Sequence, residues 1–60
     1  MTPAALKSAR RVLGLSARGM AAAVGVASGR TVRRWEAGER PVAGYVVLLI
    51  TRLLAEHAAA

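Results

Sequence analysis

The sequence predicts an all-α fold, in which residues 1–60 form one domain built as a compact bundle of four or five short helices. Apolar residues recur at spacings of three and four along the chain, and no segment alternates apolar and polar residues as a strand does. Glycines divide the chain into pieces of helical length. The chain has no cysteine, so neither disulfides nor thiolate metal sites support this small core.

The first helix is predicted to begin at Thr2 and Pro3 and to run to Leu13. The Thr2 hydroxyl can accept hydrogen bonds from free amide groups at a helix start, and a proline at the first helical position loses no intrahelical hydrogen bond. Gly14 follows where a left-handed residue commonly closes a helix. This segment therefore carries a signal for each of its ends.

Two further short helices are predicted on either side of a turn that begins at Gly25. Ser16 precedes the segment 17–24 as an N-cap, and Ser28 precedes the next segment in the same role. Gly38 closes that third helix as Gly25 closes the second. Two short helices joined by a tight glycine-containing turn form a helix-turn-helix.

The last helix is predicted over roughly residues 43–58, after a turn at Pro41. One apolar face of this helix suits the core of the domain: Val46, Leu49, Ile50 and Leu53. A polar face suits contact with water: Tyr45, Arg52 and Glu56. The four-residue spacing between Arg52 and Glu56 permits an ion pair. A second apolar face lies beside the first: Val47, Leu48 and Leu54. So small a domain needs one apolar stripe, and the second predicts a homodimer interface.

Charge and hydropathy narrow the class of partner. Nine lysines and arginines against three glutamates give a formal net charge of +6, which attracts polyanions such as nucleic acid or an anionic membrane. No apolar run approaches the roughly 18 residues that span a bilayer, and no signal peptide is visible, so we expect a cytoplasmic protein. His57 has only Glu56 beside it, and we expect no metal, cofactor or small-molecule ligand.

The segment 28–36 has two faces with different chemistry. At 3.6 residues per turn, Val32 and Trp35 lie on one side, where they suit the core. The opposite side carries three arginines: Arg30, Arg33 and Arg34. Arginine binds phosphate and guanine edges bidentately, and a helix fits the major groove of DNA, so this face predicts a DNA-reading surface.

Together these features resemble the Cro/C1-type (Xre-like) helix-turn-helix family of phage repressors and bacterial regulators. The resemblance covers roughly residues 6–54 and rests on a set of positions: Leu15-Ser16, Ala21, Gly25-Val26, Ser28, Thr31-Val32, Trp35-Glu36, Gly38 and Arg40-Pro41. It implies a lambda-repressor-like bundle that binds double-stranded DNA as a homodimer. It further implies a transcriptional regulator, of the kind found in phages and mobile elements, that acts as a repressor on an inverted repeat, for example in its own promoter.

The resemblance also implies roles for particular residues. The third helix would dock in the major groove, with base contacts from its first half: Ser28, Gly29, Arg30 and Arg33. Phosphate contacts would come from four others: Arg18, Thr31, Arg34 and Arg40. Arg10 would pair with Glu36 and join the first helix to the third. This chain departs from the family pattern in having Ala17 where a glutamine is usual and in having an extra turn residue, Ala27.

Other classes of function make different predictions. A small protein-binding module, such as an antitoxin or an adaptor, could use the same scaffold and would not need the arginines of the third helix. A membrane-active basic peptide would favour one continuous amphipathic helix, whereas the glycines here specify several. No nucleophile with a base, paired carboxylates or phosphate loop is visible, so we do not expect an enzyme.

Overall fold

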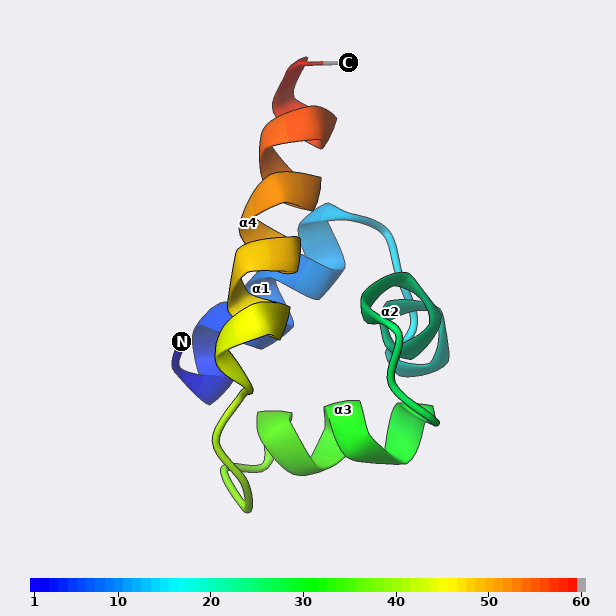
Figure 1. Ribbon diagram of the computed structural model, residues 1–60, viewed down its shortest axis with the longest axis vertical. Helices are drawn as coiled ribbons and strands as arrows, with labels where there is room; N and C mark the ends of the chain where they lie inside the picture. Colours follow the sequence, from blue (N-terminus) through cyan, green and yellow to red (C-terminus); the bar gives the residue numbers. More distant parts are fainter. Residues whose placement is uncertain (60) are drawn as a thin grey trace.

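The computed structural model describes residues 1–59 and has four helices in that range, with no strand and no fifth helix. Their bounds are α1 (Pro3–Val12), α2 (Ala17–Val24), α3 (Gly29–Glu36) and α4 (Gly44–Ala59). The all-α class predicted from the sequence is confirmed. In Figure 1, α3 lies across one end of the molecule, and α4 runs from that end toward the other, where the chain finishes.

All four helices contribute to one hydrophobic core. The buried apolar residues are Leu6, Ala9, Met20, Ala21, Val24, Val32, Trp35, Val46 and Ile50. Because each fully buried side chain of the size of Leu, Ile, Val or Met stabilises the fold by about 1.5–3 kcal/mol, these few residues provide most of the hydrophobic stabilisation. In α3 the buried pair is Val32 and Trp35, as the helical spacing predicts.

The first three helices are closed by the glycines that the sequence predicts and with the same backbone hydrogen bonds, although α1 ends at Val12, one residue before the predicted Leu13. The residue after the closing glycine donates its amide to the carbonyl five positions earlier, at 3.0 Å in each case: Leu15 to Arg10, Val26 to Ala21 and Glu39 to Arg34. The closing glycines have φ of 69°, 76° and 77°, a left-handed conformation that side chains disfavour. These glycine ends fix where the chain turns, and therefore where α2 and α3 begin.

Two of the three predicted side-chain caps are present. Thr2 Oγ1 accepts from the Ala5 amide and Ser16 Oγ accepts from the Gly19 amide, both at 3.0 Å. Ser28 occupies the N-cap position of α3, but its hydroxyl accepts no such bond, so its prediction as a side-chain cap is wrong. The amide that the hydroxyl would cap, that of Thr31, already donates to the Ser28 carbonyl at 3.2 Å.

The faces of α4 differ in part from those predicted. Val46 and Ile50 are buried and Leu49 packs beside them, as expected, but the fourth residue of α4 that packs against the core is Leu54 and not the predicted Leu53. Leu54 therefore does not belong to a partner-facing surface, because the spacing 46, 50 and 54 follows the side of α4 that faces α1 and α2. The predicted face keeps Leu48, which is 73% exposed, and the half-buried Val47.

Candidate nucleic-acid interface

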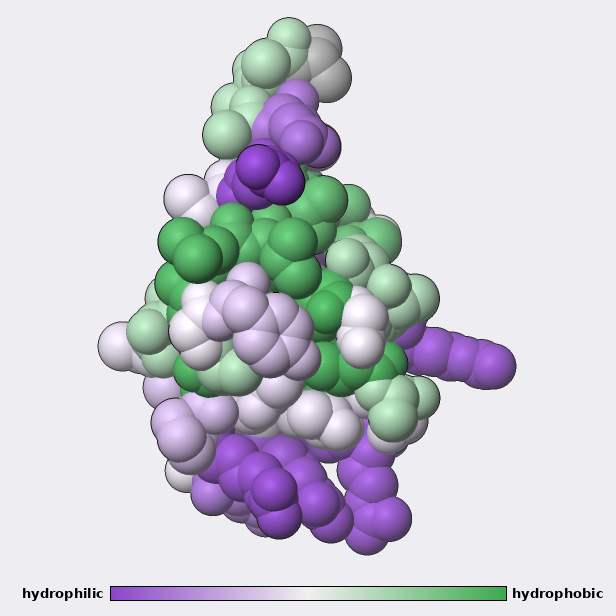
Figure 2. Space-filling model, in the orientation of Figure 1, coloured by the Kyte–Doolittle hydropathy of each residue, from purple (hydrophilic) through white to green (hydrophobic). Residues whose placement is uncertain are grey.

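The outer face of α3 carries the arginines that the sequence singled out. Arg30 and Arg33 are exposed, and Arg34 is half-buried on the flank of the helix. Since Val32 and Trp35 anchor the opposite side in the core, Arg30 projects most directly outward. Figure 2 shows hydrophilic side chains gathered at the end of the molecule where α3 lies.

Gly29 lies where the start of α3 meets the start of α2. A Cβ atom built on Gly29 would lie 2.8 Å from the Arg18 amide nitrogen and 3.1 Å from the Ala17 carbonyl carbon. Both are backbone atoms, so the absence of a side chain permits this close approach of the two helices. Gly29 is buried in that contact, which corrects its assignment as a base-contacting residue.

Arg10 ties α3 to the rest of the domain, as predicted. Its Nε donates to Glu36 Oε2 at 2.8 Å and its Nη2 donates to Glu36 Oε1 at 3.1 Å, a bidentate pair between α1 and the end of α3. Its Nη1 also donates to the Leu15 carbonyl at 3.1 Å, in the turn before α2. The Arg10 guanidinium thus joins α1, the end of α3 and the turn before α2. The Arg10 side chain is 19% exposed and the Glu36 side chain 10% exposed.

The hydrogen bonds from Arg10 to Glu36 raise the pKa of Arg10, against a smaller opposing effect of burial. A raised pKa favours the charged guanidinium in the folded protein. While Glu36 is ionised, the stabilisation that this shift supplies is present below that pKa, and it is lost as the pH rises through that pKa, in strongly alkaline solution. Arg10 therefore acts as a permanent cation at physiological pH. Arg10–Glu36 is the single salt bridge of residues 1–59, so the pairing that the spacing permitted between Arg52 and Glu56 is not formed.

The other predicted phosphate contacts are spread around α3. Arg18 is exposed in the first turn of α2, Arg40 is exposed after the end of α3, and Thr31 is half-buried within it. Within residues 1–59, Arg10 is the only arginine whose side chain forms a hydrogen bond or salt bridge, so the predicted contact residues form none: Arg18, Arg30, Arg33, Arg34 and Arg40. Their guanidinium donors are thus available to an external anion.

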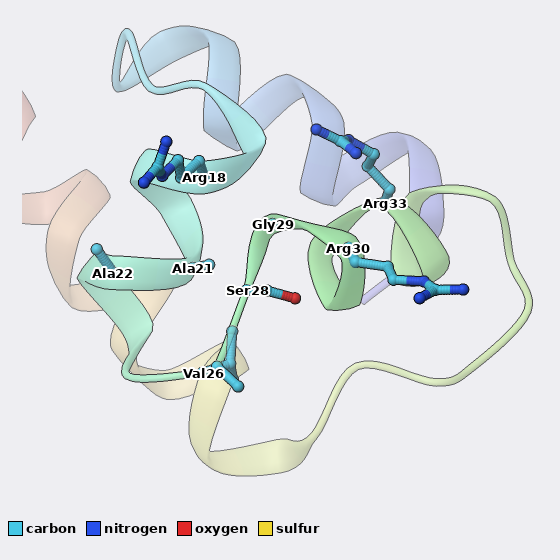
Figure 3. A pocket seen from close by; sticks show the side chains of 9 residues that line it. Arg18, Ala21, Ala22, Val26, Ser28, Gly29, Arg30 and Arg33 are labelled. Atoms are coloured by element: carbon cyan, nitrogen blue, oxygen red, sulfur yellow. The ribbon is translucent and has the colours of Figure 1, made fainter.

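A groove of about 530 Å³, open to solvent, separates the outer sides of α2 and α3. Figure 3 shows the guanidinium groups of Arg18 and Arg33 toward one end of this groove and Val26 toward the other. The exposed Ser28 hydroxyl also lines it. Sequence reasoning missed Ala22, which lines the groove beside Arg18; its only signal is the four-residue spacing from that arginine.

Fold and surface together define a small all-α domain whose helix-turn-helix presents a cationic groove. Comparison of the chain with protein-family models, with curated proteins and with solved structures found no match. Among residues 1–59, no helix has both the length and the apolar character needed to cross a membrane.

Proposed function

We propose that this chain is a sequence-specific regulator of transcription that binds double-stranded DNA with its α3 helix, in the manner of Cro/C1-type proteins. It acts as a repressor by occupying a promoter, its own being one candidate. The observation that carries this proposal is the outer face of α3, where Arg30, Arg33 and Arg34 form no hydrogen bond or salt bridge with any side chain of residues 1–59. Among side chains, arginine is the commonest specific reader of guanine.

The rigid attachment of α3 supports specific rather than indiscriminate binding. Its inner side is fixed in the core through Val32 and Trp35, its start by the close approach at Gly29, and its end by the Arg10–Glu36 pair. A helix held at three places keeps the backbone positions of its arginines fixed relative to one another, which reading a base sequence requires. A flexible basic segment would bind the phosphate backbone without preference.

The exposure of each arginine indicates whether we propose a base contact or a phosphate contact for it. Arg30 projects outward and Arg33 borders the groove, so these two read base edges, with Ser28 beside them. Arg34 lies on the flank of α3, where it reaches a phosphate. Three other side chains complete the phosphate contacts: Arg18, Thr31 and Arg40.

The protein binds as a homodimer through the exposed side of α4. Leu48 is 73% exposed and Tyr45 57%, and Figure 2 shows hydrophobic side chains gathered over the middle of this helix. A single helix face is smaller than the roughly 800 Å² per partner of a standard interface, so the dimer is weak in solution and strengthens on DNA. Two half-sites about 34 Å apart would receive the two α3 helices.

The direction of α4 determines how such a dimer is arranged. The outer face of α3 points away from the body of the molecule, and α4 runs away from the α3 end (Figure 1). Two copies can present both α3 helices to one side of a duplex only if their twofold axis runs roughly along α4. The two α4 helices of the DNA-bound dimer therefore run in the same direction, side by side.

The test is selection of bound duplexes from a random pool, followed by affinity measurements on the enriched sequence. We expect a palindromic sequence, with Arg30→Ala weakening its binding about 5- to 150-fold, the value of a bidentate base contact. Arg11→Ala, which removes the same charge from an exposed position on α1, is the matched control and should have a much smaller effect. Sequence-blind binding, or no binding, would contradict the proposal and favour the protein-binding module, for which Arg30 is dispensable.

A further inference from the structure

The side-chain chemistry of the whole chain limits which bases it can read. The 60 residues include no asparagine, glutamine or aspartate. Asparagine and glutamine are the side chains that bond bidentately to adenine, and aspartate and glutamate accept from cytosine. Of the three glutamates, Glu36 is held by Arg10, and none lines the groove between α2 and α3. The groove therefore contains neither the amide that reads adenine nor the carboxylate that reads cytosine.

The groove instead combines guanidinium groups with an apolar end. Arg18 and Arg33 lie toward one end, and Val26 lies toward the other, within the turn between the two helices (Figure 3). Val26 is half-buried and packs against the core, which fixes its position. The exposed Ala27 and Ala22 add methyl groups to the same lining. An apolar wall beside guanine-reading donors matches one base feature of the major groove, the 5-methyl group of thymine.

We propose that this protein recognises A·T pairs through the thymine methyl group, which the apolar end of the groove contacts, while its arginines read neighbouring guanines. The inference rests on the proposed DNA-binding function and adds the chemistry of base selection to it. Each half-site then combines guanine with thymine at the bases nearest the turn. Ala27, the extra residue of the turn, becomes a specificity determinant because it adds a methyl group to the lining of the groove.

Base analogues that lack one functional group test the proposed thymine contact without altering the protein. In the enriched duplex, each thymine is replaced singly by deoxyuridine, which lacks only the methyl group. We expect one or two positions per half-site to lose about fourfold in affinity, the effect of one buried methyl group. In a Ser28→Ala protein, replacing adenine by 7-deazaadenine, which removes the N7 acceptor, should leave the affinity unchanged, because neither an amide nor a hydroxyl of the groove then reads that edge.

Protein variants then locate the contact. Ala27→Gly and Ala22→Gly should reduce the loss of affinity that deoxyuridine causes, because each variant removes an alanine methyl group that would contact the thymine methyl group. Ala23→Gly is the matched control for Ala22→Gly, since it lowers helix propensity equally in α2 at an exposed position that does not line the groove. A deoxyuridine effect that persists in full in both of these variants and in Val26→Ala would overturn the assignment.

The guanine arm separates the failure of this inference from the failure of the proposed function. Replacing guanine by 7-deazaguanine should weaken binding wherever an arginine reads N7. If 7-deazaguanine weakens binding while deoxyuridine has no effect at any position, the protein reads DNA but not thymine methyl groups. If no sequence is enriched at all, both proposals fall together.

Discussion

Replacing Gly29 with alanine tests whether the close approach of α2 and α3 positions the arginine face. The added Cβ would lie 2.8 Å from the Arg18 amide nitrogen, 0.6 Å short of the 3.4 Å at which ordinary contact begins. Because the opposing atoms belong to backbone, they cannot rotate aside, and α3 must shift as a unit. Overpacking of this kind costs about 1–3 kcal/mol, whereas alanine gains at most about 1 kcal/mol of helix propensity over glycine. Subtracting the full gain leaves roughly 0–2 kcal/mol, and we expect a net destabilisation in the upper half of that range because two more backbone atoms lie at 3.0 and 3.1 Å.

Thermal unfolding followed by far-ultraviolet circular dichroism measures this change. For a domain of this size, 1 kcal/mol corresponds to a change in Tm of roughly 4–8 °C. Gly44→Ala is the matched control: Gly44 is also the first residue of its helix, but a Cβ there meets nothing within 4 Å. Its Tm should stay the same or rise. A Gly29→Ala protein as stable as Gly44→Ala would refute the close-packing argument. If Gly29→Ala is destabilised but binds DNA with unchanged affinity, the contact between α2 and α3 does not set the orientation of α3 on DNA.

Three further predictions concern stability and association. A double-mutant cycle of Arg10→Met and Glu36→Gln in urea unfolding at neutral pH should give a coupling energy of about 1–3 kcal/mol, and independent effects would contradict the bidentate pair. Ser16→Ala should cost about 1 kcal/mol in the same assay, and Ser28→Ala less than about 0.5 kcal/mol, because only the Ser16 hydroxyl caps an amide. Leu48→Ser should change stability by less than about 0.5 kcal/mol yet weaken self-association measured by sedimentation on operator DNA; unaltered association would exclude this face of α4.

The helix boundaries were predictable because their signals are local. A left-handed glycine after α1, α2 and α3, and a hydroxyl before α1 and α2, act within one turn of the chain, so the sequence contains what decides them. Ser28 has the same local pattern but a different outcome. Its own carbonyl takes the Thr31 amide at 3.2 Å, which depends on how the turn from Gly25 enters α3.

The candidate site was predictable where it depends on the pattern along α3, and less so where it depends on packing. Arg30 and Arg33 are exposed because Val32 and Trp35 face the core, which helical spacing alone indicates. The burial of Gly29 required knowing that the start of α2 passes against it. The side of α4 that faces the core likewise includes Leu54 because of how that helix lies on α1 and α2.

The packing scheme also bears on how such a protein can change. Helix α3 makes its main contacts with α2 and α1, and α4 packs separately on the same two helices. The outer face of α3 and the exposed side of α4 are therefore separate surfaces, although both helices pack on α1 and α2. A substitution on one of these surfaces does not alter the other. Variants can acquire a new target sequence at one helix and a new strength of self-association at the other, each without repacking the core.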